Sequence, residues 1–269
     1  MTADALSPRN GISAFAYEKP DLSQIARKRK TVWLGTTDRL FATIQAHQEG
    51  GEVKLHTHTH LDGFWFVLAG RVRFYSDETT VHADIGPMEG ILIPRGEKYW
   101  FEAYGPDDLE ILQIECSDRG MTKDEARFER GELHERSSEM TRFSVDPAGK
   151  TGTTWLAHTD RLFAGVEIAY QGNMPAGYHQ HHELDSFWYV LKGTMEVDNR
   201  AGDNHRMGPR TGVLIRRGET YRVRSNPNEQ VHLLKVFCAS RPLAGMSEFA
   251  QATENSLVHA AGAKALAGR

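Results

Sequence analysis

Residues 56–70 read HTHTHLDGFWFVLAG, and residues 179–193 repeat this stretch as HQHHELDSFWYVLKG. A second pair of segments, WLGTTDRLFA at residues 33–42 and WLAHTDRLFA at residues 155–164, matches at an offset of 122 residues. One residue is gained between Gly172 and His179, and the offset is again 122 by Gly208. Slips of one residue fall in loops when strands hold the register. The chain is therefore a tandem repeat.

The composition fits a protein with one large or two ordinary globular domains. The chain has 269 residues, of which 39% are hydrophobic and 25% charged, with a formal net charge of -4. Without a basic excess to neutralise phosphates, nucleic acid is not expected as a partner. The basic run at residues 27–30 is interpreted as a solvated lead-in to a strand. The N-terminus lacks the pattern of a secretory signal and no apolar run could span a bilayer, so we expect a cytoplasmic protein with no membrane partner.

Each repeat contains short β-rich segments separated by Gly, Pro, Asp and Asn. In the first repeat these are Arg71–Tyr75, Gly90–Pro94, Tyr99–Ala103 and Leu109–Cys116. Many short strands with regular turn signals predict an antiparallel sandwich or barrel.

Two helices are expected outside the repeats. The first lies within residues 122–132, where Thr122 and Glu125 have the spacing of a capping box. The second lies within the alanine-rich residues 247–266. The expected organisation is an N-terminal arm (1–30), a first barrel (31–118), a charged linker with a helix (119–150), a second barrel (151–240) and a C-terminal helical tail (241–269).

A His-x-His pair, an aromatic strand ending in Val-Leu-x-Gly and a later hairpin closing on Pro-x-Gly together resemble the two motifs of the cupin superfamily. The second motif runs from Gly86 to Gly96 in the first repeat and from Gly208 to Gly218 in the second, where Arg216 replaces the proline. The resemblance covers residues 31–116 and 153–238. It implies an all-β fold of two tandem jelly-roll barrels, a bicupin.

The usual cupin metal site has three histidines and one glutamate, and both repeats keep only the His-x-His pair. Gly63 and Ser186 stand at the glutamate position. Tyr99 and Tyr221 stand at the position of the third histidine. The same departure at tyrosine in both copies puts the ordinary four-ligand site in doubt.

Four histidines are the foremost candidate ligands. In an extended strand alternate side chains share a face, so His56 and His58 point the same way, as do His179 and His181. Such a pair could grip a metal or a substrate. Asp62 and Asp185 could each add a carboxylate, giving the two-histidine, one-carboxylate set suited to Fe(II), or they could cap the turn before the strand.

The remaining candidates have both structural and functional interpretations. Tyr99 and Tyr221 could donate a proton to a substrate, or be core residues with satisfied hydroxyls. His60 and Glu183 could be further ligands or lie in a solvated turn. Several other residues are interpreted as structural: Trp65 and Trp188 as barrel filling, Asp38-Arg39 and Asp160-Arg161 as turns, and His82, His205 and His232 as isolated histidines.

Cys116 and Cys238 occupy equivalent places in the two repeats. Because they are far apart in sequence, we expect them to fill matching core or strand-end positions rather than to form a disulfide.

Three classes of function remain open. The first is a metal-binding bicupin, with Fe, Ni, Zn or Mn, that performs dioxygenase- or isomerase-like chemistry on a small sugar or carboxylic acid. The second is a metal-free isomerase or epimerase in which His58 with Tyr99, or His181 with Tyr221, act as base and acid. The third is a non-catalytic small-molecule binding protein. A homodimer is expected in each case, because a single bicupin leaves open sheet edges.

Overall fold

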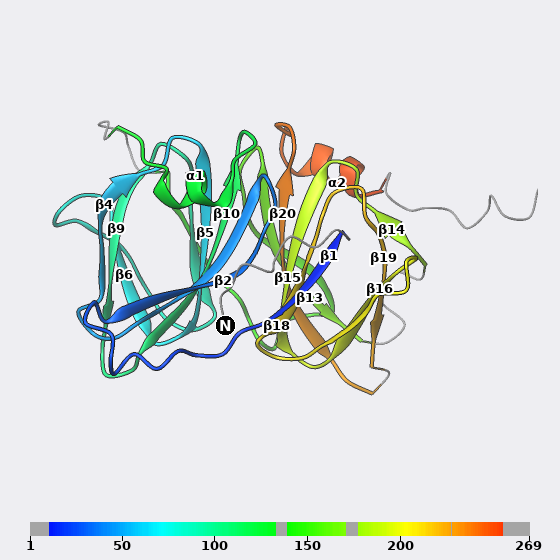
Figure 1. Cartoon of the computed structure of the whole chain (residues 1–269), viewed down its shortest axis with the longest axis horizontal. Coiled ribbons are helices and arrows are strands. Elements are labelled where there is room, and N and C mark those ends of the chain that lie inside the picture. Colours follow the sequence, from blue (N-terminus) through cyan, green and yellow to red (C-terminus); the bar gives the residue numbers. More distant parts are fainter. Residues whose placement is uncertain (1–10, 133–138, 171–176, 227, 255–269) are drawn as a thin grey trace, which may run out of the picture.

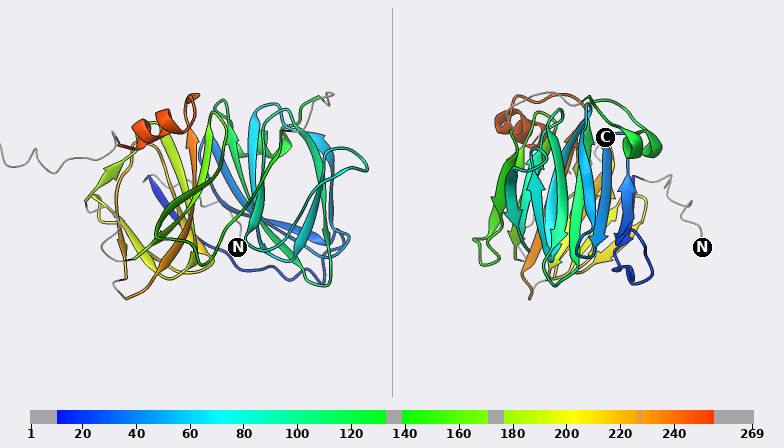
Figure 2. Two further views of the ribbon diagram at one scale, coloured as in Figure 1. Left: turned by 180° about the vertical axis from the view of Figure 1, so that it is seen from behind. Right: turned by 90° about the vertical axis from the view of Figure 1, so that its left-hand side faces the viewer.

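The computed structural model describes residues 11–132, 139–170, 177–226 and 228–254. Within these ranges the chain forms twenty strands and two short helices, arranged as two β-barrels side by side. Figure 2 shows the same pair of barrels from behind and from one end. The expected all-β fold of two jelly-roll barrels is confirmed.

The first barrel consists of a six-stranded sheet in the order β11-β8-β5-β10-β3-β2 and a four-stranded sheet in the order β4-β9-β6-β7, all antiparallel. Its strands are β2 (Arg29–Thr36), β3 (Leu40–His47), β4 (Glu52–Thr57), β5 (Leu61–Ala69), β6 (Arg71–Tyr75), β7 (Val81–Ile85), β8 (Glu89–Ile93), β9 (Lys98–Tyr104), β10 (Leu109–Ser117) and β11 (Thr141–Ser144).

The second barrel repeats this topology, with sheets in the order β1-β18-β15-β20-β13-β12 and β14-β19-β16-β17. Its strands are β1 (Ile12–Ala16), β12 (Gly152–His158), β13 (Leu162–Ala169), β14 (His179–Gln180), β15 (Leu184–Lys192), β16 (Met195–Asn199), β17 (Asn204–Met207), β18 (Thr211–Ile215), β19 (Thr220–Ser225) and β20 (Val231–Ala239). The residue gained between Gly172 and His179 falls in a part of the chain that includes residues 171–176, which lie outside the described residues.

The barrels exchange strands. β1 precedes the first repeat but pairs with β18 of the second barrel, whereas β11 precedes the second repeat but pairs with β8 of the first. In each case a phenylalanine ring covers a glycine: Phe15 lies opposite Gly212, and Phe143 lies opposite Gly90. A Cβ atom on either glycine would overlap that ring, so the docking of both exchanged strands requires glycine at these positions.

Strand alternation divides the core into three parts. On β5, Trp65 and Val67 point into the first barrel, while Phe64 and Phe66 point toward the second. The outward residues of both six-stranded sheets form one shared core between the barrels, and each barrel also has an interior core. Both faces of these sheets are therefore buried, which explains the nearly continuous apolar run in the repeated stretch.

Cys116 and Cys238 form a disulfide between β10 and β20, with their Cα atoms 5.6 Å apart. The expectation that they would not form a disulfide was wrong. The barrels pack back to back with approximate two-fold symmetry, and a residue close to such an axis meets its own counterpart from the other repeat. A sequence separation of 122 residues gives no indication of that proximity.

The two helices lie at the same end of the two barrels (Figure 1). α1 (Lys123–Phe128) has the expected capping box, because Glu125 N donates to Thr122 Oγ1 and Thr122 N donates to the Glu125 carboxylate. It ends earlier than residue 132 because Glu129 adopts an extended conformation. α2 (Met246–Glu254) lies in the second predicted region, and residues 255–266 of that region are outside the described residues. Neither helix is long and apolar enough to cross a membrane.

Candidate functional site

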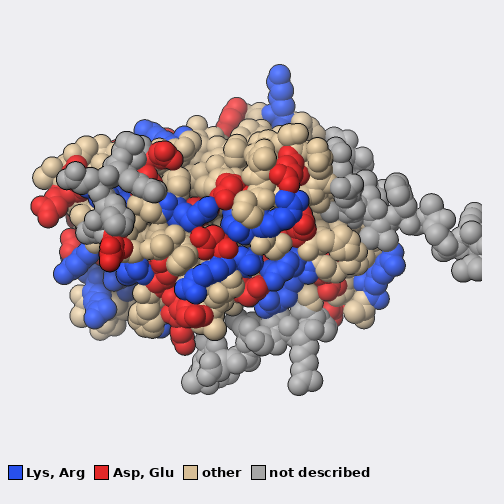
Figure 3. All heavy atoms as spheres, turned by 90° about the horizontal axis from the view of Figure 1, so that it is seen from above, with Lys and Arg blue, Asp and Glu red and all other residues tan. Residues whose placement is uncertain are grey.

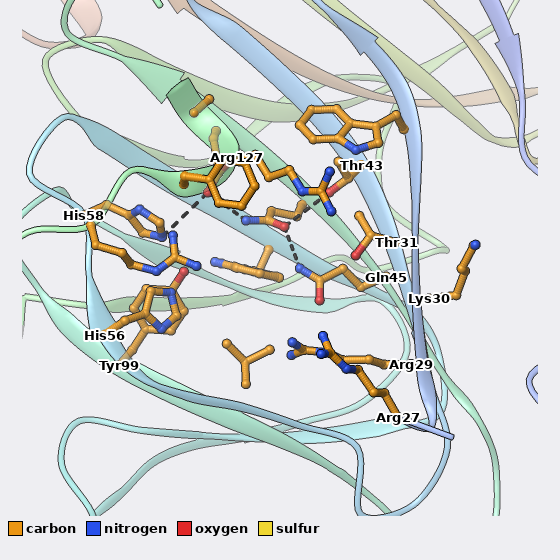
Figure 4. A pocket seen from close by; sticks show the side chains of 18 residues that line it. Arg27, Arg29, Lys30, Thr31, Thr43, Gln45, His56, His58, Tyr99 and Arg127 are labelled. Carbon is orange, nitrogen blue, oxygen red and sulfur yellow. Dashed lines mark hydrogen bonds and ion pairs between the residues drawn. The ribbon is translucent and has the colours of Figure 1, made fainter. Parts of the chain in front are cut away.

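The interior of the first barrel contains a cavity of about 570 Å³. His56 at the end of β4 and Tyr99 on β9 are cross-strand neighbours in its wall, and Trp65 on β5 also lines it. Figure 4 shows His56, His58 and Tyr99 on one side of this cavity, with Arg27, Arg29 and Lys30 on the opposite side.

The structure brings His56 and His58 together, with ring centroids 4.9 Å apart and ring planes nearly perpendicular. Nδ1 of His56 bonds to the carbonyl oxygen of Lys54 at 2.7 Å. A ring N–H donated to a backbone carbonyl fixes the orientation of an imidazole and leaves Nε2 for another ligand. Burial, assisted by the neighbouring His58, lowers the pKa of His56 to about 3, so this ring is neutral at physiological pH.

His58 lies between two carboxylates. Its Nδ1 is 2.8 Å from Oε2 of Glu129, and its Nε2 is 3.8 Å from Oε1 of Glu115. Glu129 follows α1 directly, and its other carboxylate oxygen accepts a hydrogen bond from Thr59 N at 2.9 Å. The segment after α1 therefore fixes both the turn after β4 and the orientation of the His58 ring.

The two carboxylates have opposite pKa shifts. Burial raises the pKa of Glu115, and the neighbouring His58 and Arg130 offset this rise only in part. Burial also acts to raise the pKa of Glu129, but the hydrogen bonds from His58 and Thr59 outweigh it, and the pKa of Glu129 lies below its usual value. Glu115 thus holds its proton more tightly than an ordinary glutamate, and Glu129 is the carboxylate that stays charged beside His58.

Tyr99 is buried against both histidines. Its ring centroid lies 4.4 Å from that of His56 and 6.1 Å from that of His58. Burial, together with the nearby Glu115, raises the pKa of Tyr99 well above its usual value. The hydroxyl therefore stays protonated and can donate to an acceptor in the cavity.

Five cationic side chains line the same cavity: Arg27, Arg29, Lys30, Arg127 and Arg130. Within the described part of the chain, none of the five forms a direct ion pair with a carboxylate. The interpretation of residues 27–30 as a solvated lead-in to a strand was incomplete, because three of those four residues form part of the cavity wall. Figure 3, which views the molecule from above, shows basic and acidic groups interspersed over that face. The five cations of the cavity therefore stand out locally from a surface of mixed charge.

The second barrel has a smaller and more apolar cavity of about 300 Å³, lined by His179, His181, Tyr221, Trp188 and Phe237 among others. His181 Nε2 lies 2.7 Å from the Tyr221 hydroxyl. Burial, and then the neighbouring His179, lowers the pKa of His181 to about 4, while burial raises the pKa of Tyr221. The residues that line this cavity include no counterpart of the five cations of the first cavity. Lys235 lines it, but its charge is paired with Glu167.

Residues 166–237 match the family model of the cupin domain. The chain therefore contains a cupin domain in its second barrel. Solved structures of several two-barrel cupins and related proteins share its fold. AerE from Microcystis aeruginosa matches with a TM-score of 0.59 and 10% identity, covering 83% of this chain and 98% of AerE. Protein Ylba from E. coli matches with a TM-score of 0.60 and 9% identity, covering 87% and 93% of the two chains.

A variant of oxalate decarboxylase OxdC from Bacillus subtilis matches this cupin with a TM-score of 0.57 and 14% identity, covering 93% of this chain and 85% of the decarboxylase. Another matching structure of the same decarboxylase is described as containing Mn(II) centres. No curated protein sequence matches the chain significantly. At these identities the likeness concerns the fold alone.

Asp62 and Asp185 of this cupin do not join the histidines, so their interpretation as metal ligands is wrong. Asp62 Oδ2 accepts hydrogen bonds from Arg95 Nη1 at 2.8 Å and from Thr159 Oγ1 of the other barrel at 2.7 Å. Asp62 stands three residues before the inward-facing Trp65, and Asp185 stands three residues before the inward-facing Trp188. Because side chains alternate along a strand, both carboxylates lie on the opposite face from the tryptophans. Each aspartate instead has a structural role at the start of its strand, close to the alternative that it caps the turn before the strand.

The other two candidate ligands are also engaged elsewhere. His60 Nδ1 lies 3.0 Å from Asp118 Oδ1, and Glu183 forms an ion pair with Arg241 at 2.8 Å. Neither residue lines the cavity of its barrel. The turn before β5 and its counterpart before β15 redirect the chain, so the alternation that unites the His-x-His pair does not continue to these positions.

The donors present do not fit a resident metal site. In the described ranges no group of three or more His, Cys, Asp and Glu side chains is placed to hold an ion. In the second barrel the Nε2 atom of His181 already bonds to Tyr221. Each barrel thus offers two histidines without the further protein donors that complete a cupin metal centre.

Glu115, Glu129 and the five cations are the functional residues that sequence reasoning missed. Glu115 was detectable in principle, because the equivalent residue of the second repeat is Phe237: Glu115 lies opposite Gly63 and Phe237 opposite Ser186. A charge that replaces an aromatic residue on an interior strand position is unusual. For Glu129 and Arg130 we find no such signal, since they reach the cavity only through the path of the chain after α1.

Proposed function

We propose that this cupin binds a small anionic metabolite, a carboxylic acid or an acidic sugar, in the first barrel and catalyses a proton-transfer isomerisation there. The observation that supports the proposal is the set of five cations that surrounds a cavity holding His58, Tyr99 and Glu115. Arg29 is half-buried without a carboxylate partner among the described residues, and an anionic ligand would supply that counter-ion, whereas the other four cations are exposed and attract it more weakly.

Charge magnitudes favour an anion over a neutral sugar. Two unit charges about 4 Å apart attract by roughly 4 kcal/mol at the effective dielectric constant of a protein surface, against roughly 1 kcal/mol in water. A contact with the half-buried Arg29 would approach the first value and contacts with the four exposed cations the second, and together they would favour an anionic ligand over its neutral analogue. The cationic residues Arg27, Arg29 and Lys30 stand across the cavity from the histidines, so an anionic group held there would orient the rest of the ligand toward His58 (Figure 4).

His58 is the group that we assign as the base. The bond from Nδ1 to the charged Glu129 places the proton on Nδ1 and the lone pair on Nε2. Nε2 can then remove a proton from a carbon next to a carbonyl or carboxylate group. Tyr99, which stays protonated, donates a hydrogen bond to the oxygen on which negative charge develops. The proton held on Nε2 of His58 is then delivered to the neighbouring carbon, which gives the isomer and restores the neutral imidazole.

A metal-dependent version is the second candidate. One observation favours it: both histidines of the first barrel use Nδ1 for orientation, His56 toward a carbonyl and His58 toward a carboxylate, as metal-binding histidines commonly do. His56 and His58 would supply two donors to a divalent ion such as Fe, Ni, Zn or Mn. With no third protein donor, such binding would be weak.

Hydrogen exchange in deuterated water tests the proposal without knowledge of the product. Metal-free protein is incubated in D2O with a panel of small 2-keto acids and uronic acids, and loss of the signal of the carbon-bound hydrogen next to the carbonyl is followed by NMR. We expect exchange that disappears in His58→Ala. Exchange only after metal addition would support the second candidate, and saturable binding without exchange would identify a non-catalytic binding protein.

Two further properties belong to the proposal. We propose a homodimer, because β2 and β12 are edge strands of the six-stranded sheets within the described chain. We also propose a cytoplasmic location, which rests on the sequence alone.

A further inference from the structure

The two barrels have diverged in the chemistry of their interiors. Gln113 and Glu115 on β10 correspond to Lys235 and Phe237 on β20, because Gln113 pairs with Trp65 and Lys235 pairs with Trp188 in the two ladders. The charge of Lys235 is neutralised by Glu167. The interior of the second barrel therefore carries no uncompensated charge from these strands, in contrast to the first.

A cluster of aromatic rings under α2 lies against the wall of the second cavity. Phe249 on α2 stacks on Phe163 with ring centroids 4.3 Å apart and meets Trp155 edge-on at 4.9 Å. At the equivalent point of α1 stands the small Ala126, since Ala126 N donates to Thr122 O and Phe249 N donates to Gly245 O in the first turns of the two helices. α2 thus supplies an aromatic ring that supports Trp155 and Phe237 in the wall of the second cavity, whereas α1 contributes Arg127 and Phe128 to the wall of the first.

Two polar atoms of the residues that line this apolar cavity, His181 Nδ1 and Trp188 Nε1, have no hydrogen-bond partner among the described residues. His181 is 92% buried and lines the cavity, and its Nδ1 atom has no hydrogen-bond partner among the described residues. If the Tyr221 hydroxyl donates to Nε2 of His181, the imidazole carries its proton on Nδ1. The N–H groups of His181 Nδ1 and Trp188 Nε1 are then two buried donors without an acceptor, and each costs about 1–3 kcal/mol.

We propose that the second barrel is a separate binding site for a small, uncharged aromatic molecule that carries one hydrogen-bond acceptor. The ring of the ligand packs against Trp155, Trp188 and Phe237, and the acceptor meets the N–H of His181. The cavity of about 300 Å³ suits a ligand with a single or fused ring. This site is independent of the anion site in the first barrel, and neither proposal requires the other.

Three probes of similar size test the proposed chemistry: acetophenone, ethylbenzene and benzoate. Acetophenone has the ring and the acceptor, ethylbenzene lacks the acceptor, and benzoate carries a charge. Ligand-observed NMR and calorimetry on the full chain should show saturable 1:1 binding of acetophenone, at least tenfold tighter than binding of ethylbenzene. Benzoate binding at this site should be weaker still.

Variants locate the site. Phe237→Glu, which installs the residue type of the first barrel, should weaken acetophenone binding at least tenfold, and Trp155→Ala should weaken it severalfold. Trp155 is 40% exposed, so its replacement tests the proposal even if Phe237→Glu does not fold. The matched control is Phe128→Ala, which removes an exposed aromatic ring from the mouth of the first barrel and should have no effect.

Three results would overturn the proposal. The first is that acetophenone shows no saturable binding. The second is that benzoate binds as tightly as acetophenone and loses affinity in the same second-barrel variants. The third is that Phe128→Ala abolishes acetophenone binding while Trp155→Ala leaves it intact.

Discussion

The hydroxyl of Thr37 in the first barrel donates a hydrogen bond to the carboxylate of Asp185 in the second barrel at 2.7 Å, although 148 residues separate them. Thr159 and Asp62 form the reciprocal contact, also at 2.7 Å. Each aspartate is almost fully buried and also holds an arginine of its own barrel, Arg217 or Arg95. These two matching networks fix the relative position of the barrels.

We expect Asp185→Ala to lower the free energy of unfolding by about 2–4 kcal/mol, because it leaves the buried Thr37 hydroxyl without its acceptor and removes one of the two carboxylates paired with Arg217. Urea denaturation measures the loss. Asp203→Ala, at an aspartate in the loop between β16 and β17, is the control and should cost less than half as much. Equal losses for the two variants would show that the contact between the barrels adds no stability of its own.

Glu129→Gln should slow the proposed hydrogen exchange by about 10- to 100-fold while ligand affinity changes less than threefold, because it removes the charge that orients His58 rather than a contact with the ligand. Exchange rates and binding constants are measured on the same samples. Glu132→Gln changes an exposed carboxylate three residues away and is the control. A fall in affinity with an unchanged exchange rate would assign Glu129 to ligand binding instead.

Arg130→Gln should weaken binding of an anionic ligand about five- to tenfold and flatten the salt dependence of its affinity, because one of the five cavity cations is lost. Calorimetry at two ionic strengths gives both quantities. Arg222→Gln, in the second barrel, removes an arginine that is already paired with Asp198 and should leave the affinity unchanged. An unchanged affinity in Arg130→Gln, or the same loss in both variants, would contradict a specific anion site in the first barrel.

His47 predicts a pH dependence of stability. Burial, and then the charge of Arg29, lowers the pKa of this fully buried histidine to about 4. Between pH 6.5, near the pKa of the unfolded chain, and pH 4, His47 is protonated in the unfolded chain but not in the folded protein. The contribution of His47 to stability is therefore fully present above pH 6.5 and is lost as the pH falls toward 4. The loss from this residue is about 3 kcal/mol.

His47→Gln should reduce that slope, and denaturation at several pH values from 4 to 7 measures it. If the slopes of wild type and His47→Gln coincide, the ring does not carry the pH dependence.

Sequence reasoning predicted the architecture well because the fold depends on local patterns. The paired occurrence of HTHTHLDGFWFVLAG and its copy fixed the strand register, so that His56 and Tyr99 were expected in one barrel and are cross-strand neighbours. Their counterparts His179 and Tyr221 are also cross-strand neighbours, as the internal symmetry requires. Turn chemistry and the capping box at Thr122 likewise depend only on neighbouring residues.

The relations between the barrels could not be predicted in the same way. Asp62 was expected beside the histidines, but its carboxylate meets Thr159 of the other repeat, because alternation tells which face a side chain occupies and not what packs on that face. The disulfide of Cys116 and Cys238 was missed for the same reason. Glu129 reaches His58 through a loop, and loop paths leave no periodic signal in a sequence.

The exchange of β1 and β11 affects the order in which the chain can fold during its synthesis. β1 leaves the ribosome before the other described strands, but its partner β18 follows almost two hundred residues later. The first barrel, in turn, lacks an edge strand until β11 has emerged from the exit tunnel. A gene divided between the two repeats, in front of β11, would therefore yield a first half that cannot complete its own sheet and a second half that lacks the covering ring of Phe15. The two halves would have to be made together, and they would assemble by donating strands to each other.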